Sequence, residues 1–205
     1  MVFSIMKSQD VLLVLKLLAM EIRQQEDELY TLRSHDWWCG WHDDRVVTTI
    51  SIEWTYQQLS NSLGISASEC HGAVNRCLHN QLLRISRKTQ RPIPIARNIT
   101  EFCVHGLKYM LPIEVGAVVR GIPTTYASPV LVGQLLGAGD LPYVWPDGTG
   151  KVMGISLLPI HKSVTKAVKN DPILYELLAL VDSIRMGHAR EAELAKNLFI
   201  QRVKI

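Results

Sequence analysis

The segment Trp54–Leu83 constrains the fold most, because it contains two short helical patterns in immediate succession. The first pattern follows Thr55, a residue type that caps helices, and stops at Gly64, which readily adopts the left-handed conformation of helix C-termini. The second opens with Ser66 and Glu69, a capping box in which each side chain can bond a free backbone N–H of the other residue. Two helices joined by so short a turn have the layout of a helix-turn-helix, whose second helix enters the major groove of DNA.

Basic residues concentrate on the second of these helices and just after it. Residues 64–108 contain seven Lys or Arg and two Glu, a net charge of +5, whereas the whole chain carries +3 and the remainder therefore sums to −2. A basic surface beside a helix-turn-helix is the pattern expected of a protein that neutralises DNA phosphates. The alternative is a solvated basic face without a partner.

The polar side chains of the second helix, residues 67–80, are the candidates for DNA contact. We expect Asn75 to read adenine and Arg76 to read guanine through paired hydrogen bonds, while the serines at the helix N-terminus bind phosphate. The alternatives are an unpaired surface charge for Arg76 and a solvent-facing side chain for His71. The predicted DNA-contacting residues are Thr55, Ser66, Ser68, Glu69, His71, Asn75, Arg76, His79, Arg84, Arg87, Lys88 and Arg91.

A compressed basic wing is predicted after the second helix. Residues 82–85 alternate as a short strand would, and residues 86–91 are polar and basic. Pro92 and Pro94 remove backbone donors from the returning strand, which predicts an edge strand with little regular pairing. The basic side chains of this wing would contact phosphates whatever the DNA sequence.

An apolar helix is predicted to begin at Ser8 and to continue through Ile22. It is apolar nearly all round, whereas a helix on a protein surface has one polar face. A helix of this kind is buried on several sides, either in the domain core or against a second subunit.

The tryptophan-rich segment 34–44 interrupts the helical pattern. Its His35, Cys39 and His42 are residue types that bind zinc, and the Cys-x-x-His spacing suits one half of a site. No second ligand pair follows nearby, so the favoured interpretation is that the tryptophan rings fold onto the domain. We therefore expect no metal and no cofactor, and a short β-branched strand over residues 45–52.

Glycine and proline become frequent after Pro112, which predicts loops and short strands before the chain returns to helix. A strand is predicted over Lys151–Leu158, with Leu141–Trp145 as its partner. The predicted helices run from Asn98 or Thr100 to Met110, over Val164–Val168, from a cap at Asp171 to Gly187, and over Ala189–Val203.

The sequence contains no motif of catalysis: G-x-S-x-G, H-E-x-x-H, the P-loop and G-x-G-x-x-G are all absent. Cys103 and His105 lie two residues apart, so a shared helix directs them to different sides, which argues against a thiol–imidazole pair. We therefore expect no enzyme. His105, Arg120 and Tyr126 are the candidates for binding a small-molecule effector.

Several features indicate a folded protein of the cytoplasm. The hydrophobic fraction of 47% can build a sizeable core. The apolar run near the N-terminus contains Lys16 and is too short to cross a membrane, and residues 1–7 lack the pattern of a secretory signal. The four cysteines form no C-x-x-C pair, which indicates reduced thiols.

SQDVLLVLKLL, WTYQQLSNSLGISASECHGAVNRCLHNQLL and the basic segment that follows resemble the winged helix-turn-helix domain of MarR-type bacterial transcriptional regulators. EFCVHGLKYMLP, VVRGIPTTYASP, VWPDGTGKVMG and ELLALVDSIRMGHARE are similar to bacterial proteins described as MarR-like. The resemblance implies an α+β, mainly helical fold, with a winged helix-turn-helix domain over residues 1–95 and a small α+β domain over residues 96–205. Residues 21–52 form a longer connection than is usual in such domains.

The sequence therefore predicts a homodimeric regulator that binds specific double-stranded DNA, with repression as the expected output. A small-molecule effector or a partner protein stays open as a further partner. The alternative is an antitoxin-like or adaptor protein that binds another protein through the winged helix and the carboxy-terminal helices. Its binding surfaces would be the apolar first helix and the leucine-rich helix over residues 174–184.

Overall fold

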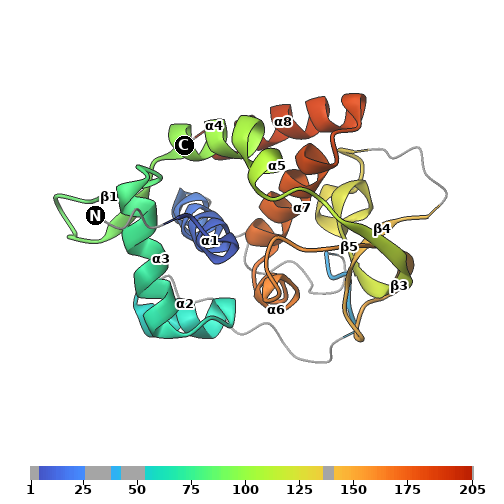
Figure 1. The fold of residues 1–205 in the computed structure, drawn as a ribbon, viewed down its shortest axis with the longest axis horizontal. Helices are drawn as coiled ribbons and strands as arrows, with labels where there is room; N and C mark the ends of the chain where they lie inside the picture. Colours follow the sequence, from blue (N-terminus) through green and yellow to red (C-terminus); the bar gives the residue numbers. More distant parts are fainter. Residues whose placement is uncertain (1–4, 26–37, 43–53, 136–140, 205) are drawn as a thin grey trace.

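The computed structural model describes residues 5–25, 38–42, 54–135 and 141–204. Its fold is α+β and mainly helical, as the sequence predicted (Figure 1). The helices are α1 (Ser8–Gln25), α2 (Tyr56–Leu63), α3 (Ala67–His79), α4 (Ala96–Glu101), α5 (Leu107–Met110), α6 (Val164–Val168), α7 (Pro172–Met186) and α8 (Ala189–Val203). The strands are β1 (Leu83–Ile85), β2 (Pro92–Pro94), β3 (Val115–Pro123), β4 (Tyr143–Pro146) and β5 (Val152–Leu157).

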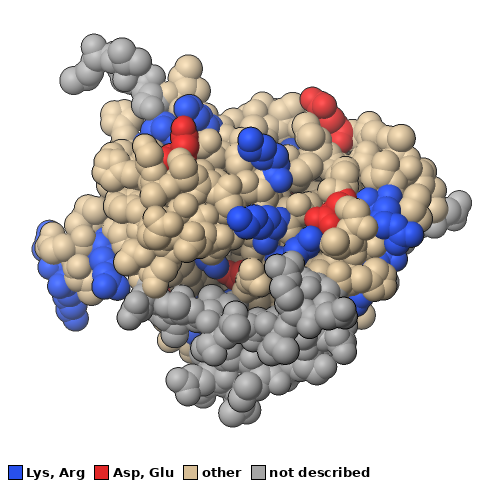
Figure 2. Space-filling view, turned by 90° about the horizontal axis from the view of Figure 1, so that it is seen from below, with Lys and Arg blue, Asp and Glu red and all other residues tan. Residues whose placement is uncertain are grey.

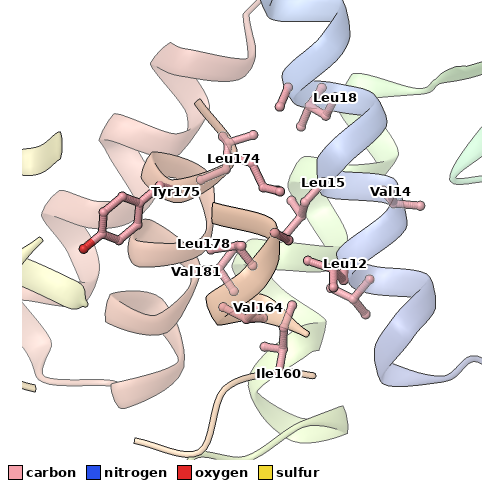
Figure 3. Packing of buried hydrophobic residues seen from close by; sticks show 14 of the residues in the cluster. Leu12, Val14, Leu15, Leu18, Ile160, Val164, Leu174, Tyr175, Leu178 and Val181 are labelled. Carbon is pink, nitrogen blue, oxygen red and sulfur yellow. The ribbon is translucent and has the colours of Figure 1, made fainter. Parts of the chain in front are cut away.

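Helix α1 lies in the interior, and all its residues from 10 to 19 are buried. Helix α3 flanks it on one side and α7 on the other (Figure 1). Leu12, Leu15 and Leu18 point toward the leucines of α7, whereas Val14 points to the opposite side (Figure 3). Of the two predicted ways of burying this helix, the core of the protomer is the one observed.

Two cations of α1 converge on one carboxylate at the start of α7. Lys16 Nζ lies 2.7 Å from Asp171 Oδ2, and Arg23 Nη2 lies 2.7 Å from Asp171 Oδ1. Asp171 is 1% exposed and also caps α7 by accepting a hydrogen bond from the backbone N–H of Leu174 at 3.1 Å. Burial raises the pKa of Asp171, but the two cations outweigh that effect and hold the pKa below its ordinary value.

A second buried carboxylate, Asp182, joins α7 to the strands. It accepts hydrogen bonds from Trp145 Nε1 at 2.7 Å, from Thr124 Oγ1 at 3.2 Å and from Arg185 Nη1 at 2.6 Å. Burial raises the pKa of Asp182, since these donors offset the cost of burying its charge only in part. The Arg185 guanidinium also donates to the backbone oxygen of Leu111 at 2.8 Å, so the network holds the chain just before β3.

The three strands described in the second half all pair with one another. β3 pairs antiparallel with both β4 and β5, and β4 pairs in parallel with β5. The predicted partner of β5 is therefore confirmed, but the length of β3 was not predicted. A Cβ atom at Gly121 would collide with the backbone of Trp145, and one at Gly150 would collide with Gly121. The glycines of this half thus allow three backbones to approach one another, in addition to forming turns.

The predicted helices of the second half are mostly confirmed. α6 and α8 have the predicted bounds, and α7 begins after the Asp171 cap and ends at Gly187, which has a φ of 75°. The helix before β3 begins earlier than predicted, at Ala96, because Asn98 is not a cap: its side chain donates to the backbone oxygen of Gln81 at 2.7 Å. Between α4 and α5 the helix passes through a π-helical turn at Phe102–Gly106.

The core is continuous across the predicted domain boundary at residue 95. One cluster of buried hydrophobic residues includes Leu12 of α1, Val74 of α3 and Leu178 of α7. The division into residues 1–95 and 96–205 stays a prediction, and in the described part of the chain the two halves share this cluster. The predicted strand over residues 45–52 lies outside the described residues.

We expect Asp171→Asn to lower the free energy of unfolding by about 3–5 kcal/mol, because it leaves two cations without their buried counter-charge. Asparagine is an equally good cap, so the loss reports the ion pairs rather than the start of α7. Urea denaturation followed by circular dichroism measures the change. Glu193→Gln is the control, since its exposed pair with Lys196 at 3.2 Å should contribute less than about 0.5 kcal/mol.

The same carboxylate predicts a pH dependence. Because folding lowers the pKa of Asp171, its stabilisation is complete above the unfolded pKa, about 3.9, and is lost as the pH falls through the lower folded value. The free energy of unfolding should therefore fall less steeply between about pH 5 and pH 2 in Asp171→Asn than in the natural chain. Equal slopes in urea titrations across this range would contradict the assignment.

Candidate nucleic-acid interface

The turn between α2 and α3 has the predicted geometry. Thr55 Oγ1 accepts a hydrogen bond from the backbone of Gln58 at 3.1 Å, and Gly64 ends α2 with a φ of 66°. Ser66 Oγ accepts from the backbone N–H of Glu69 at 3.2 Å and so caps α3. The reciprocal bond of the capping box is not observed, because the Glu69 carboxylate accepts a hydrogen bond from the side chain of Gln9 in α1.

One side of α3 faces solvent, and we call its side chains the reading face: Ser68, His71, Asn75 and His79, all of which are exposed. Asn75 Nδ2 and His71 Nδ1 lie 3.3 Å apart, one helical turn from each other. The His71 ring also meets the Tyr56 ring edge to face, with centroids 5.2 Å apart. These contacts fix the orientation of two polar side chains that still present open hydrogen-bonding groups to solvent. The opposite side of the helix is buried through Cys70, Ala73, Val74 and Cys77.

Arg76 does not belong to the reading face, which corrects the prediction that it reads guanine. Its Nε lies 2.7 Å from Asp10 Oδ2 and its Nη2 lies 2.6 Å from Asp10 Oδ1, a two-point ion pair with α1. The Asp10 side chain is fully buried and that of Arg76 is 11% exposed. The fork that would bind guanine is therefore occupied by a carboxylate. The alternative of an unpaired surface charge is also wrong.

The segment after α3 forms a regular hairpin, contrary to the predicted lack of pairing. β1 and β2 are antiparallel, with Arg84 opposite Ile93. Backbone bonds from Ile95 N to Leu82 O and from Ser86 N to Arg91 O, 2.9 and 2.8 Å long, show that odd-numbered residues of the returning strand face β1. Pro92 and Pro94 therefore face away, where their missing N–H groups cost the ladder nothing.

The hairpin tip, residues 86–91, carries the basic side chains outward. Its backbone is closed by a bond from Gln90 N to Ser86 O at 2.9 Å. Arg84 on β1 and Arg87, Lys88 and Arg91 at the tip are exposed, and none of these four forms an ion pair with another described residue. Figure 2 shows Lys and Arg at the end of the molecule that the hairpin occupies in Figure 1. Unpaired exposed cations are available to phosphates.

The tryptophan-rich segment folds inward in its described part. Trp38 and Trp41 are buried, with ring centroids 5.3 Å apart, and Trp41 forms a β-bridge with Gly150. Of the candidate metal ligands, Cys39 is buried, His42 is exposed, and His35 lies outside the described residues. Within the described part of the chain, no group of His, Cys, Asp or Glu side chains is arranged to hold a metal ion.

The candidate effector residues are not brought together. His105 is exposed on the π-helical turn, Arg120 donates from β3 to the backbone oxygen of Gly150 at 3.2 Å, and Tyr126 donates to that of Leu141 at 3.1 Å. A pocket of ≈ 440 Å³ lies elsewhere, where α1, α7 and α8 meet, and none of the three candidates lines it. Cys103 is buried and burial raises the pKa of its thiol to about 12, while His105 points outward, as the helical spacing predicted.

The sequence did not indicate that Asp10 holds the proposed DNA-reading helix α3 in place. Asp10 sits in the first turn of α1, receives a hydrogen bond from the backbone of Lys7 at 2.8 Å and binds Arg76. An acidic residue at the start of an otherwise apolar helix is the signal that could have found it, since such a charge needs a buried counter-charge when the helix lies in the core.

Comparisons with protein-family models, with curated proteins and with solved structures found no match to this chain. No helix in the described part of the chain has the length and apolar character needed to span a membrane.

We expect Arg76→Ala to lower the free energy of unfolding by about 3–5 kcal/mol, because it leaves the buried Asp10 carboxylate without its partner. Asn75→Ala, on the adjacent exposed position, is the matched control and should change stability by less than about 0.5 kcal/mol. Chemical denaturation of both variants tests the assignment. Equal stabilities of Arg76→Ala and the natural chain would show that the ion pair does not hold α3 against α1.

Proposed function

We propose that the chain is a double-stranded DNA-binding transcriptional regulator of the winged helix-turn-helix type, acting as a homodimeric repressor. The observation that carries the proposal is the juxtaposition of an exposed polar face on α3 with a basic hairpin that follows it directly. In this class of protein, the second helix of the turn motif enters the major groove and flanking elements contact the backbone. The hairpin is the wing of this arrangement.

The reading face contains the groups that base recognition needs. Asn75 presents an amide that can pair with adenine, and His71 presents a ring nitrogen beside it. Ser68 near the helix N-terminus is placed for phosphate, where backbone N–H groups favour an anion. Arg76 takes no part in base reading in this proposal, because Asp10 holds it. It acts instead by fixing α3 on α1.

The alternative, an antitoxin-like or adaptor protein, loses the two surfaces first assigned to it. Helix α1 is buried from residue 10 to residue 19, and nearly all of α7 is buried as well. Neither helix offers its apolar residues to a partner. An adaptor would have to use α8 or the strands, so the DNA-binding proposal accounts for more of the exposed side chains.

DNA binding separates the two classes. We expect the chain to retard DNA from upstream of its own coding region, and Asn75→Ala to weaken that binding by about 1–3 kcal/mol while relaxing specificity at one base pair. Arg87→Ala combined with Arg91→Ala should weaken binding to all sequences alike and reduce the salt slope by about one for each lost phosphate contact. Fluorescence anisotropy at several salt concentrations measures both effects.

Lys196→Ala is the control for the hairpin change, because it removes a cation from α8 on another part of the surface. It should leave affinity and salt slope unchanged. Unaltered DNA affinity in both test variants at low salt would contradict the docking of α3 and the hairpin. Absence of DNA binding together with co-purification of a protein encoded by a neighbouring gene would favour the adaptor.

A further inference from the structure

The first part of β3 has an edge that no described strand covers. β3 extends over Val115–Pro123, but β4 pairs with its last three residues alone, from Gly121 onward. Residues 114–118 are all exposed, including Gly116 and Ala117. Because those two residues have little or no side chain, their exposure means that the backbone itself is open to solvent.

The direction of the backbone groups follows from the bonds at the covered end. Asp147 N donates to Arg120 O at 3.2 Å and Thr124 N donates to Tyr143 O at 2.9 Å, so even-numbered residues from Arg120 onward face β4. Ile155, which lies opposite Val118 in β5, likewise directs its N–H away from β3. Strand alternation therefore points the N–H and C=O of Val118 along the same edge, beyond the end of β4. A bulge shifts the register of β3 against β5 between Val115 and Val118, so the alternation changes there. The backbone N–H of Leu158 donates to Glu114 O at 3.0 Å, so Glu114 faces β5 and Val115 faces the open edge together with Val118.

The exposed face next to this edge is apolar. Val115 is 56% exposed, Val118 is 50% exposed, and Met153 of β5 is 50% exposed. Met153 lies opposite Arg120, two residues from Val118, so Val118 and Met153 share one face of the sheet. An apolar strand with an open edge is a template for pairing with another strand, and proteins rarely leave such an edge uncovered.

We propose that a second copy of this chain covers the edge, with the two β3 strands antiparallel about a two-fold axis. Glu114 directly precedes β3, and Arg120 stands at the other end of the exposed segment. Neither forms an ion pair with a described residue, and Arg120 Nη1 donates to the backbone oxygen of Gly150 at 3.2 Å. Antiparallel pairing places each end beside the opposite end of the other strand, so Glu114 lies near the partner's Arg120 at both ends. The edge is thus complementary to itself, as a two-fold interface requires.

This interface rests on the homodimer of the proposed function and is independent of DNA binding. β3 and the hairpin lie at opposite ends of the molecule (Figure 1). Pairing through β3 therefore leaves the reading face and the hairpin tip uncovered. The other edge of β3 is occupied by β5, so the pairing closes with two copies instead of growing into a fibre.

Light scattering after size-exclusion chromatography tests the interface. The natural chain should have twice the protomer mass of 23.1 kDa at high micromolar concentration, and Val118→Lys should have 23.1 kDa with an unchanged circular dichroism spectrum. Leu194→Lys, which changes an exposed apolar residue of α8, is the matched control and should remain dimeric. A monomeric natural chain, or a dimeric Val118→Lys, would overturn the proposal.

If Val118→Lys fails to fold, charge-reversal variants at the two ends of the exposed segment test the interface. Glu114→Arg and Arg120→Glu should each raise the dimer dissociation constant by about tenfold or more, because each places like charges together at both ends of the pair. The double variant should regain the natural value. If it does not, the interface is wrong.

DNA binding gives an independent readout. The monomeric variant should still bind a single half-site with the natural affinity, whereas Asn75→Ala should remain dimeric. A dimer that Val118→Lys does not dissociate overturns the interface and leaves the DNA-binding proposal standing. A dimer that behaves as expected but binds no DNA supports the interface and overturns the proposed function.

Discussion

The structure depends on the burial of α1, an apolar helix that carries charges it cannot leave unpaired. Asp10 pairs with Arg76 of α3, and Lys16 and Arg23 pair with Asp171 at the start of α7. An isolated charge in a protein interior costs several kcal/mol, whereas a paired and hydrogen-bonded one is tolerated. Each ion pair can form only when its helix lies in one position along α1. The hydrophobic cluster supplies the driving force, and these charges specify how α3 and α7 are placed.

The same arrangement links the two halves of the chain to the proposed reading face. α1 holds α3 through one ion pair and α7 through two others, and Ser163 beside α6 donates a hydrogen bond to the backbone oxygen of Gly64 at 3.2 Å. The turn between α2 and α3 is therefore supported from the carboxy-terminal half as well as from α1. A helix that reads DNA needs such rigid support, because base contacts fail with small displacements.

Local features were predictable from the sequence, and contacts between distant residues were not. Thr55, Ser66 and Gly64 act on backbone groups a few residues away, so their pattern alone placed α2 and α3. The Asp10–Arg76 pair spans 66 residues, and nothing in the local pattern of either residue names its partner. The local pattern therefore predicts a DNA contact for Arg76, which lies among the polar positions between the apolar ones of α3.

The structure differs from the prediction at two further places, where proline or glycine can serve either in a loop or in a paired strand. Prolines in the returning strand of the hairpin predict a loss of pairing, but Pro92 and Pro94 occupy the alternate positions that need no donor. The glycines after residue 112 predict loops and short strands, but their spacing does not show that Gly121 and Gly150 permit close approach between strands. In both cases strand register decides the outcome, and register depends on a partner strand that a single sequence does not reveal.

The position of β3 at the end of the molecule opposite the hairpin has a consequence for any dimer built on it. The two α3 helices would stand at the outer ends of an elongated pair, separated by the length of both protomers. A chain of 205 residues has a radius of gyration of about 17 Å, so this separation exceeds the ~34 Å between half-sites on successive turns of DNA. If the proposed DNA binding and the proposed dimer both hold, the two α3 helices would contact two distant stretches of DNA with a loop between them, instead of adjacent turns of one short operator.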